Sequence, residues 1–284
     1  MRVPVAASVA CLAAACVAPG AASWSSSSAQ APATATATAQ VPATAPVAKL
    51  QCAWPRGAQA AVSLTYDDAL SSQLQFAVPA LDAAGLKATF FLSGGNIAAF
   101  AELAGSGHEL ASHTLHHPCN ADLAALDAAS MASELDAGDA AVKELGVTGK
   151  LTFAYPCGQL RMKNGESYVP LVQERFRAAR GVAASVADPA SVDLFNVPAL
   201  FPPPTSDGTD VLDLVQRAEA QHGWAVIGVH GVTEAGEYLQ LQKAAHDKII
   251  AYLAQHRATL WTAPFGSVVD AVLACRAGAQ TAGK

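Results

Sequence analysis

Charged side chains are scarce in this sequence of 284 residues, and no stretch of it concentrates lysine or arginine. Only 14% of the residues are charged, and the formal net charge is -6. A protein that binds nucleic acid presents a basic face to the phosphates, so this composition argues against nucleic acid as a partner. Hydrophobic residues make up 52% of the chain, which is ample for a buried core.

The sequence also lacks an apolar run of the ~20 residues that a transmembrane helix needs. The apolar run 3–17 follows Arg2 and precedes the small residues 20–22. This order is typical of an export signal, so residues 1–22 are predicted to be a signal peptide, with a buried core helix as the alternative. We therefore expect a secreted or periplasmic protein. A lipid anchor at Cys16 is the alternative to release, although Ala13 rather than leucine stands three residues before it.

Residues 23–48 carry no charge and, apart from one tryptophan, contain only Ala, Ser, Thr, Pro, Val and Gln. Such a segment cannot bury a core, and its composition is typical of a flexible linker. Residues 49–284 remain as one folded domain. Its length is normal for a single α/β barrel.

Short apolar runs alternate with Ala/Leu-rich segments in this domain, and the alternation indicates a parallel sheet covered by helices. The predicted strands are 60–65, 87–92, 108–112, 150–155, 176–182, 194–199, 224–230 and 260–265. The predicted helices are 71–85, 122–146, 209–223 and 240–257. We expect Pro79 to delay or kink the first helix and Gly138 to weaken the second. Eight strands in one domain predict a closed, irregular α/β barrel, whose site lies at the carboxyl ends of its strands.

Acidic and imidazole side chains follow several of these strands: Asp67 and Asp68 the first, His113 and His117 the third, and His230 the seventh. On a helical turn, two histidines four residues apart face the same way and can share one ion. One aspartate added to them gives a three-ligand set with an open position, as in catalytic zinc sites. Each element alone is weak evidence, since an Asp-Asp pair often caps a turn and paired histidines often lie on the surface. Their combination on the ends of strands is much more specific.

The motifs SLTYDDAL, HELASHTLHHP, FAYPCG and VIGVHG, in this order, closely resemble those of the polysaccharide deacetylases, carbohydrate esterase family 4. The resemblance runs from about Trp54 to Leu273. It implies a distorted (β/α)7 barrel that hydrolyses acetyl groups with a bound Zn²⁺, or with Co²⁺ or Ni²⁺ in its place. The family includes chitooligosaccharide, chitin and peptidoglycan deacetylases and some acetylxylan esterases.

The resemblance also implies a role for each matching residue. Asp67 corresponds to the general base and His230 to the general acid. The metal ligands correspond to Asp68, His113 and His117. The backbone N–H of Cys157 corresponds to the donor to the oxyanion, and Tyr155 and Pro156 belong to the substrate-binding motif.

One departure from the family pattern concerns the arginine that orients the base. Ala154 stands at its position, and either Arg161 or Arg180 could replace it from elsewhere in the chain. Because this arginine is missing from the motif, a carbohydrate-binding barrel without catalytic activity stays open as an alternative.

Four cysteines lie in the domain, and an even number in an exported protein favours disulfides over free thiols. Four cysteines allow three pairings. We favour Cys119 with Cys157, since each follows a motif, which leaves Cys52 with Cys275 to join the two ends of the domain. Buried free thiols remain open as an alternative, and the lack of a C-x-x-C spacing argues against a zinc-thiolate site.

The function expected from this pattern is removal of N-acetyl groups from a chitin-, peptidoglycan- or poly-N-acetylglucosamine-like polysaccharide. An esterase that removes O-acetyl groups from xylan is the alternative enzyme, because the two reactions differ only in the leaving group. A metallopeptidase is disfavoured, since Thr114 occupies the position of the glutamate in an H-E-x-x-H helix.

Overall fold

The structure is a computed structural model, and it describes residues 52–236 and 239–282. The predicted signal peptide 1–22, the linker 23–48 and the candidate lipidation site Cys16 lie outside the described residues. None of the described helices combines the length and the apolar character that a membrane span requires.

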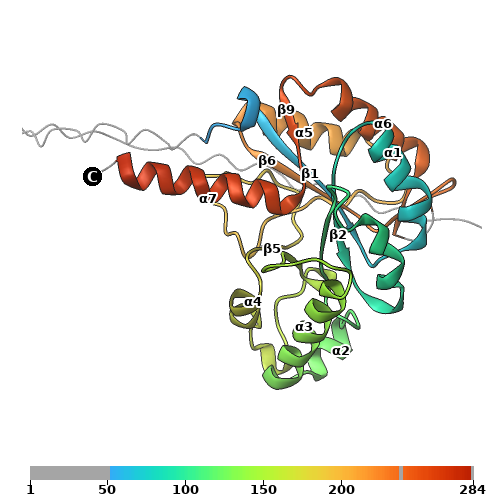
Figure 1. The fold of residues 1–284 in the computed structure, drawn as a ribbon, viewed down its shortest axis with the longest axis vertical. Coiled ribbons are helices and arrows are strands. Elements are labelled where there is room, and N and C mark those ends of the chain that lie inside the picture. Colours follow the sequence, from blue (N-terminus) through green and yellow to red (C-terminus); the bar gives the residue numbers. More distant parts are fainter. Residues whose placement is uncertain (1–51, 237–238, 283–284) are drawn as a thin grey trace, which may run out of the picture. The chain divides into compact units, whose positions relative to one another are not determined.

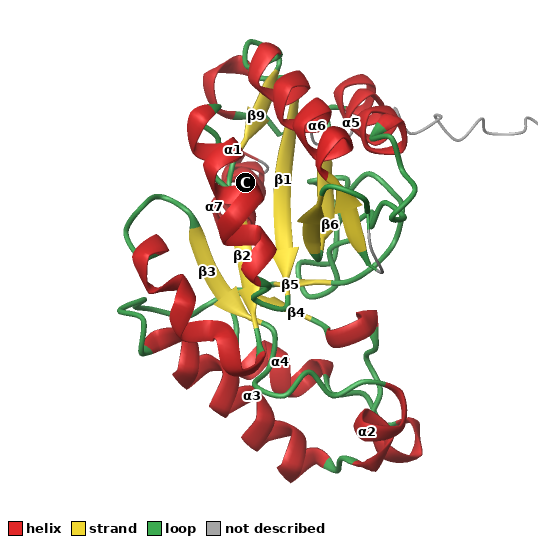
Figure 2. Cartoon of the chain, turned by 90° about the vertical axis from the view of Figure 1, so that its right-hand side faces the viewer, coloured by secondary structure: helices red, strands yellow, loops and turns green. Residues whose placement is uncertain are grey.

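A parallel sheet forms the centre of the fold, with β1 between β2 and β6 (Figure 2). The order of its strands is β5-β4-β3-β2-β1-β6. Their bounds are β1 Ala60–Asp67, β2 Thr89–Leu92, β3 Glu109–Ser112, β4 Phe153–Ala154, β5 Ala179–Arg180 and β6 Trp224–Val229. A further strand, β9 (Leu260–Thr262), pairs with the first residues of β1. A two-stranded ladder of β7 (Gly231–Thr233) and β8 (Gln240–Gln242) follows β6.

The predicted strand 194–199 is wrong as a regular strand, but its residues still close the barrel. Single parallel bridges join Arg180 to Val197 and Leu200 to Ile227. Pro198 stands between the two bridges and has no N–H to donate, so a continuous ladder cannot form there. One bridge therefore joins the segment to β5 and the other joins it to β6. The segment closes the barrel between these two strands, and the predicted distorted α/β barrel is confirmed.

Helices lie outside the sheet (Figure 1). They are α1 Val78–Ala83, α2 Asn120–Ala125, α3 Ala128–Lys143, α4 Val169–Arg175, α5 Thr209–Gln221, α6 Lys243–Gln255 and α7 Phe265–Ala282. The predicted helices 209–223 and 240–257 are confirmed as α5 and α6, although β8 takes the first residues of the latter. The single helix predicted over 122–146 is wrong: Asp127 accepts a hydrogen bond from the Ser130 N–H at 2.8 Å and begins α3 as its N-cap.

The predicted helix 71–85 contains a π-helical turn, Gln73–Ala77, directly before α1. Pro79 has no N–H, so the regular α-helical bond that this residue would donate cannot form. The wider π turn accommodates the hydrogen bond that Pro79 cannot donate. Such turns are frequent at functional sites.

The side chains of β1 alternate between two environments, as the period of a strand requires. Val62, Leu64 and Tyr66 belong to the hydrophobic cluster that includes residues of helices α1 to α6, whereas Ala61 belongs to a second cluster, which includes residues of α7. Asp67 has the same parity as Ala61 and therefore faces the interior side of the barrel, at the carboxyl end of the strand. This alternation places a buried carboxylate at the mouth of the barrel.

One buried pair outside the barrel mouth makes stability depend on pH. The Tyr66 hydroxyl and His246 Nε2 lie 2.8 Å apart, and His246 is only 2% exposed. Burial lowers the pKa of His246 to about 4, against about 6.5 in the unfolded chain. The unfolded state therefore binds more protons than the folded state between these two values, and stability falls as the pH decreases through this window.

We expect His246→Gln to reduce the loss of stability between pH 6.5 and pH 4, because glutamine has no titrating group. The difference between wild type and variant should be on the order of 3 kcal/mol across the window. Urea unfolding at a series of pH values measures it. An unchanged pH dependence in the variant would contradict this assignment.

Candidate active site

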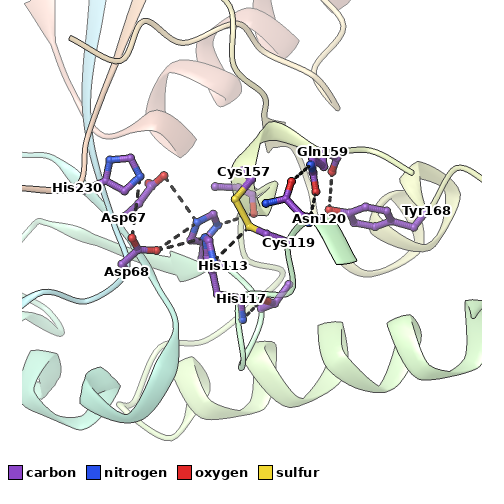
Figure 3. The surroundings of a disulfide bond; sticks show 12 residues. Asp67, Asp68, His113, His117, Cys119, Asn120, Cys157, Gln159, Tyr168 and His230 are labelled. Carbon is purple, nitrogen blue, oxygen red and sulfur yellow. Dashed lines mark hydrogen bonds and ion pairs between the residues drawn. A yellow bond between two sulfur atoms is a disulfide. The ribbon is translucent and has the colours of Figure 1, made fainter. Parts of the chain in front are cut away.

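The predicted metal ligands come together at the mouth of the barrel, where β1 and β3 end (Figure 3). His113 Nε2 lies 3.6 Å and His117 Nε2 lies 3.4 Å from Oδ1 of Asp68. One ligand atom from each of the three residues lies within 4.8 Å of the others. A single ion can therefore contact all three.

His113 is held in the tautomer that a metal ligand needs. Its Nδ1 lies 2.8 Å from the backbone carbonyl oxygen of Ala154, which can only accept a hydrogen bond. The proton therefore sits on Nδ1, and the lone pair of Nε2 faces Asp68. Burial lowers the pKa of His113 to about 4, which keeps the imidazole neutral.

The helical turn predicted for His113 to His117 is wrong. These residues form a loop after β3, in which Thr114 has φ 64° and His117 has φ 53°, both in the left-handed region. The Thr114 hydroxyl accepts a hydrogen bond from the His117 N–H at 3.0 Å and stabilises this conformation. The two rings still converge, with centroids 4.7 Å apart.

Asp67 is paired with a buried arginine from β5. Arg180 Nη2 lies 2.5 Å from Asp67 Oδ2, and Arg180 is fully buried. The guanidinium stacks between Phe91 and Phe201, at 5.2 Å and 4.8 Å from their ring centroids. Burial alone would raise the pKa of Asp67, but the positive charge of Arg180, with His113 and His230, outweighs it and lowers the pKa. The carboxylate is therefore ionised.

This pairing favours Arg180 as the substitute for the arginine that the motif at Ala154 lacks. Of the two candidates, Arg180 contacts Asp67, the predicted base, whereas Arg161 donates to the carbonyl of Gly165 at 2.7 Å. Arg180 belongs to the strand next to β4, so the guanidinium reaches Asp67 from the neighbouring position in the sheet.

Gln73, in the π-helical turn, is a site residue that sequence reasoning missed. It is fully buried, and its side-chain amide donates to the backbone carbonyl of Asp67 at 2.5 Å and to that of His230. One side chain therefore ties together the ends of β1 and β6. Nothing in the pattern 71–85 distinguished this glutamine from a polar surface residue.

His230 approaches the carboxylates from the side opposite the other two imidazoles (Figure 3). Its Nε2 lies 4.0 Å from Asp68 Oδ2, and its ring centroid lies 5.2 Å from that of Phe201. Gly228 leaves the space for Phe201, because a Cβ there would lie 2.2 Å from its ring.

A cavity of about 330 Å³ opens over these groups. It is lined by Asp67, Asp68, His113, His117, Tyr155, Cys157, Gly158, Arg180, Val182, Phe201, His230 and Leu239. A larger hollow of about 650 Å³ lies beside α5, but it contains none of the converging imidazoles, so the chemistry points to the smaller cavity.

The two residues predicted to bind substrate lie differently with respect to this cavity. Tyr155 is among the lining residues, yet it is 1% exposed and its hydroxyl donates to the carbonyl of Phe195 at 2.8 Å. Pro156 is buried and starts a short 3₁₀ turn outside the lining. A substrate contact by either residue stays a prediction.

Both favoured disulfides are present. Cys119–Cys157 joins the loop of His117 to the turn after β4, and Cys52–Cys275 links the two ends of the domain across 223 residues of sequence. Beside the first disulfide, Asn120 and Gln159 exchange two hydrogen bonds of 2.8 Å. The two loops at the mouth of the site are therefore fixed to each other by covalent and polar contacts.

Helix α3 packs against the loop of the histidines at Gly138. A Cβ at this position would lie 2.6 Å from the carbonyl carbon of Thr114 and 3.0 Å from the nitrogen of Leu115. The glycine that weakens the helix therefore allows the backbone of α3 to approach the residues between His113 and His117.

We expect Gly138→Ala to displace this loop and to weaken the binding of a divalent cation by about 10- to 100-fold. Zn²⁺ titration of the metal-free protein measures it. Gly278→Ala in α7 is the matched control: it makes the same change in a helix, but among the described residues no atom outside the surrounding helical backbone lies within 4 Å of the added Cβ. Equal cation affinity of Gly138→Ala and the control would contradict the proposed packing.

Comparisons with known proteins agree with these observations. The polysaccharide deacetylase family model matches residues 56–167. A search of curated protein sequences found no match.

Solved structures with the same fold include three polysaccharide or peptidoglycan deacetylases. A Mycobacterium smegmatis protein assigned as a polysaccharide deacetylase has 19% identity and a TM-score of 0.56, covering 79% of this chain and 93% of its own. The Bc1960 peptidoglycan N-acetylglucosamine deacetylase has 20% identity and a TM-score of 0.51, covering 75% and 89%. A variant of the peptidoglycan deacetylase PdaC from Bacillus subtilis has 17% identity and a TM-score of 0.50, covering 78% and 96%.

At these identities the structures establish the shared fold, and the family model adds a sequence match over residues 56–167. That segment contains the two aspartates, the two histidines of the loop and the turn that carries Cys157. The predicted resemblance is therefore confirmed: this chain has the sequence signature and the fold of the polysaccharide deacetylases.

Proposed function

We propose that this protein is an exported, metal-dependent hydrolase that removes N-acetyl groups from a polysaccharide. The observation that carries the proposal is the convergence of Asp68, His113 and His117 beside an ionised, buried Asp67. These groups offer a cation site and a base within one small cavity. The contact of Arg180 with Asp67 supports catalysis over the non-catalytic alternative, because the proposed base then has an arginine beside it.

The residues present fit a divalent cation. Oδ1 of Asp68 is buried and has no hydrogen-bond partner among the described residues, although it faces two imidazoles. Two nitrogens and one oxygen would leave an open coordination position on the ion. Such a ligand set suits Zn²⁺, and it suits Co²⁺ or Ni²⁺ as well. When bound there, the ion would polarise the acetyl carbonyl and acidify a water molecule.

Asp67 is suited to the role of general base. Arg180 holds Oδ2, while Oδ1 is buried and has no hydrogen-bond partner among the described residues. An ionised oxygen without a partner can accept the proton of the attacking water. Gln73 holds the backbone carbonyl of the same residue, so the carboxylate is positioned from both ends.

His230 and Cys157 complete the proposed mechanism. His230 lies across the carboxylates from the proposed ligands, where it can donate a proton to the leaving nitrogen. The backbone N–H of Cys157, in the wall of the cavity, would donate to the developing oxyanion. An amine leaves poorly without a proton, so loss of His230 should slow amide cleavage more than ester cleavage.

The proposal of export rests on the disulfides, which persist in oxidising compartments. It agrees with the predicted signal peptide, and the choice between release and a lipid anchor at Cys16 depends on residues outside the described part.

Acetate release tests the substrate class. The full-length mature protein is incubated with chitin oligomers, peptidoglycan, poly-N-acetylglucosamine and acetylated xylan, each with added Zn²⁺. We expect release from at least one N-acetylated polymer. Release from acetylated xylan alone would reject the amide assignment in favour of the esterase, and release from no substrate would support the non-catalytic alternative.

A further inference from the structure

A second group of potential metal ligands lies next to the proposed catalytic set and uses the other face of His117. The group consists of His117, Cys119 and Cys157, whose ligand atoms lie within 4.8 Å of one another. His117 Nε2 faces Asp68 at 3.4 Å, whereas its Nδ1 lies 3.6 Å from the Sγ of Cys119. One imidazole therefore stands between a carboxylate and a disulfide (Figure 3).

We propose that the Cys119–Cys157 disulfide is a latent thiolate metal site, which forms when the bond is reduced and takes a soft or borderline cation such as Zn²⁺. A disulfide sulfur is not a useful metal ligand, but two thiolates and one imidazole nitrogen are preferred ligands of zinc. In a tetrahedral zinc site, a sulfur at 2.3 Å and a nitrogen at 2.1 Å lie about 3.6 Å apart. The Nδ1–Sγ spacing already has this value.

The two sulfurs would remain close after reduction, because the loops that carry them have other contacts. Asn120 and Gln159 follow the two cysteines closely in sequence and exchange two hydrogen bonds. The Tyr168 hydroxyl also donates to the carbonyl of Gln159 at 2.8 Å. The thiols therefore need to separate only from bonding distance to about 3.8 Å, the spacing of two sulfurs around zinc.

The disulfide is open to a reductant. Cys157 is exposed and Cys119 is partly exposed, whereas Cys52 of the other disulfide is buried. A phosphine reductant supplies two electrons that break the S–S bond. The oxygen of one water goes to the phosphine oxide, and its two protons go to the sulfurs. Each thiol then loses its proton to solvent when it binds the cation.

The two sites would compete through His117. A neutral imidazole has one lone pair, so binding through Nδ1 moves the proton away from that nitrogen and onto Nε2, which then cannot bind a cation. Occupation of the sulfur site therefore removes His117 from the set with Asp68 and His113. The existence of the sulfur site does not depend on the proposed function, since it rests on the positions of the two sulfurs and of His117 Nδ1.

Absorption of bound Co²⁺ tests the proposal without a substrate, because thiolate ligation gives an intense charge-transfer band in the near ultraviolet. Co²⁺ is added to the full-length mature protein before and after treatment with a phosphine. The matched variant is Cys119→Ser/Cys157→Ser, which keeps the Cys52–Cys275 pair and so reports any signal from those thiols. A second variant, His117→Gln, keeps both thiols and removes the imidazole.

We expect the band in reduced wild type. Reoxidation or addition of Zn²⁺ should remove it, and Cys119→Ser/Cys157→Ser should not show it. His117→Gln should need a higher Co²⁺ concentration for the same absorbance. The same spectrum in reduced wild type and Cys119→Ser/Cys157→Ser would overturn the proposal. A band that His117→Gln leaves unchanged would also overturn it, because the thiols would then bind without the imidazole, as they would in an unfolded chain.

Discussion

Asp67→Asn is expected to reduce the rate of acetate release by about 10²- to 10⁴-fold, because an amide cannot accept the proton of the attacking water. Asparagine has nearly the same shape, so it can keep its place beside Arg180. The loss should appear in kcat, with KM little changed, because the variant removes proton transfer and not substrate binding. Initial rates over a range of substrate concentrations separate the two constants.

Asp68→Asn is the matched comparison, since it makes the same chemical change at the adjacent residue. It should weaken metal binding, whereas Asp67→Asn should leave one cation bound. This difference separates the proposed base from the proposed ligand. If Asp67→Asn retained full activity, or lost its metal as Asp68→Asn is expected to, the role of Asp67 as base would be wrong.

Arg180→Met is expected to decrease the free energy of unfolding by about 3–5 kcal/mol, the range found when one partner of a buried ion pair is removed. Both partners are almost completely buried, so the variant leaves a buried carboxylate without its charged partner. The pKa of Asp67 should rise, because burial then acts without its largest opposing charge. The acidic limb of the rate–pH profile should therefore move to higher pH.

Chemical unfolding of four proteins tests the coupling: wild type, Asp67→Asn, Arg180→Met and the double variant. The double variant buries no unpaired carboxylate, so it should be less destabilised than the sum of the two single variants. Arg180→Lys is the control for charge without the planar guanidinium that stacks between Phe91 and Phe201. Additive effects would show that the two side chains do not stabilise each other.

The position of the site could be predicted from the sequence, because the informative residues follow predicted strands. A carboxylate or imidazole at the carboxyl end of a parallel strand lies at one edge of the barrel whatever the details of the strand. Asp67, Asp68 and His113 were placed correctly for this reason. The identity of the arginine beside Asp67 was not predictable, since Arg161 and Arg180 fit the sequence equally and only the pairing of β4 with β5 separates them.

The errors concern local backbone structure. Spacing alone suggested a helical turn between His113 and His117, but the left-handed conformations of Thr114 and His117 produce a loop that brings the rings together in another way. The hydrophobic periodicity predicted one helix running through Asp127, but the side chain of Asp127 caps the start of a separate helix, α3. In both places a short polar side chain bonds to nearby backbone, and this overrides the hydrophobic pattern.

Two further residues act through backbone contacts that no sequence pattern displays. Gln73 donates to the carbonyls of Asp67 and His230, which lie far from each other in sequence. Gly138 gives space to Thr114, in a loop that precedes its helix. Each effect depends on where one chain segment passes another, so it appears only once the fold is known.

The metal content of the purified protein tests the central claim most directly. After dialysis against Zn²⁺ and removal of the free ion, elemental analysis should find about one zinc per wild-type chain. It should find little zinc in Asp68→Ala, His113→Ala and His117→Ala, and wild-type content in His116→Ala, whose side chain pairs with Glu134. Wild-type zinc content in all four variants, or none in wild type, would contradict the assignment of Asp68, His113 and His117 as the metal site.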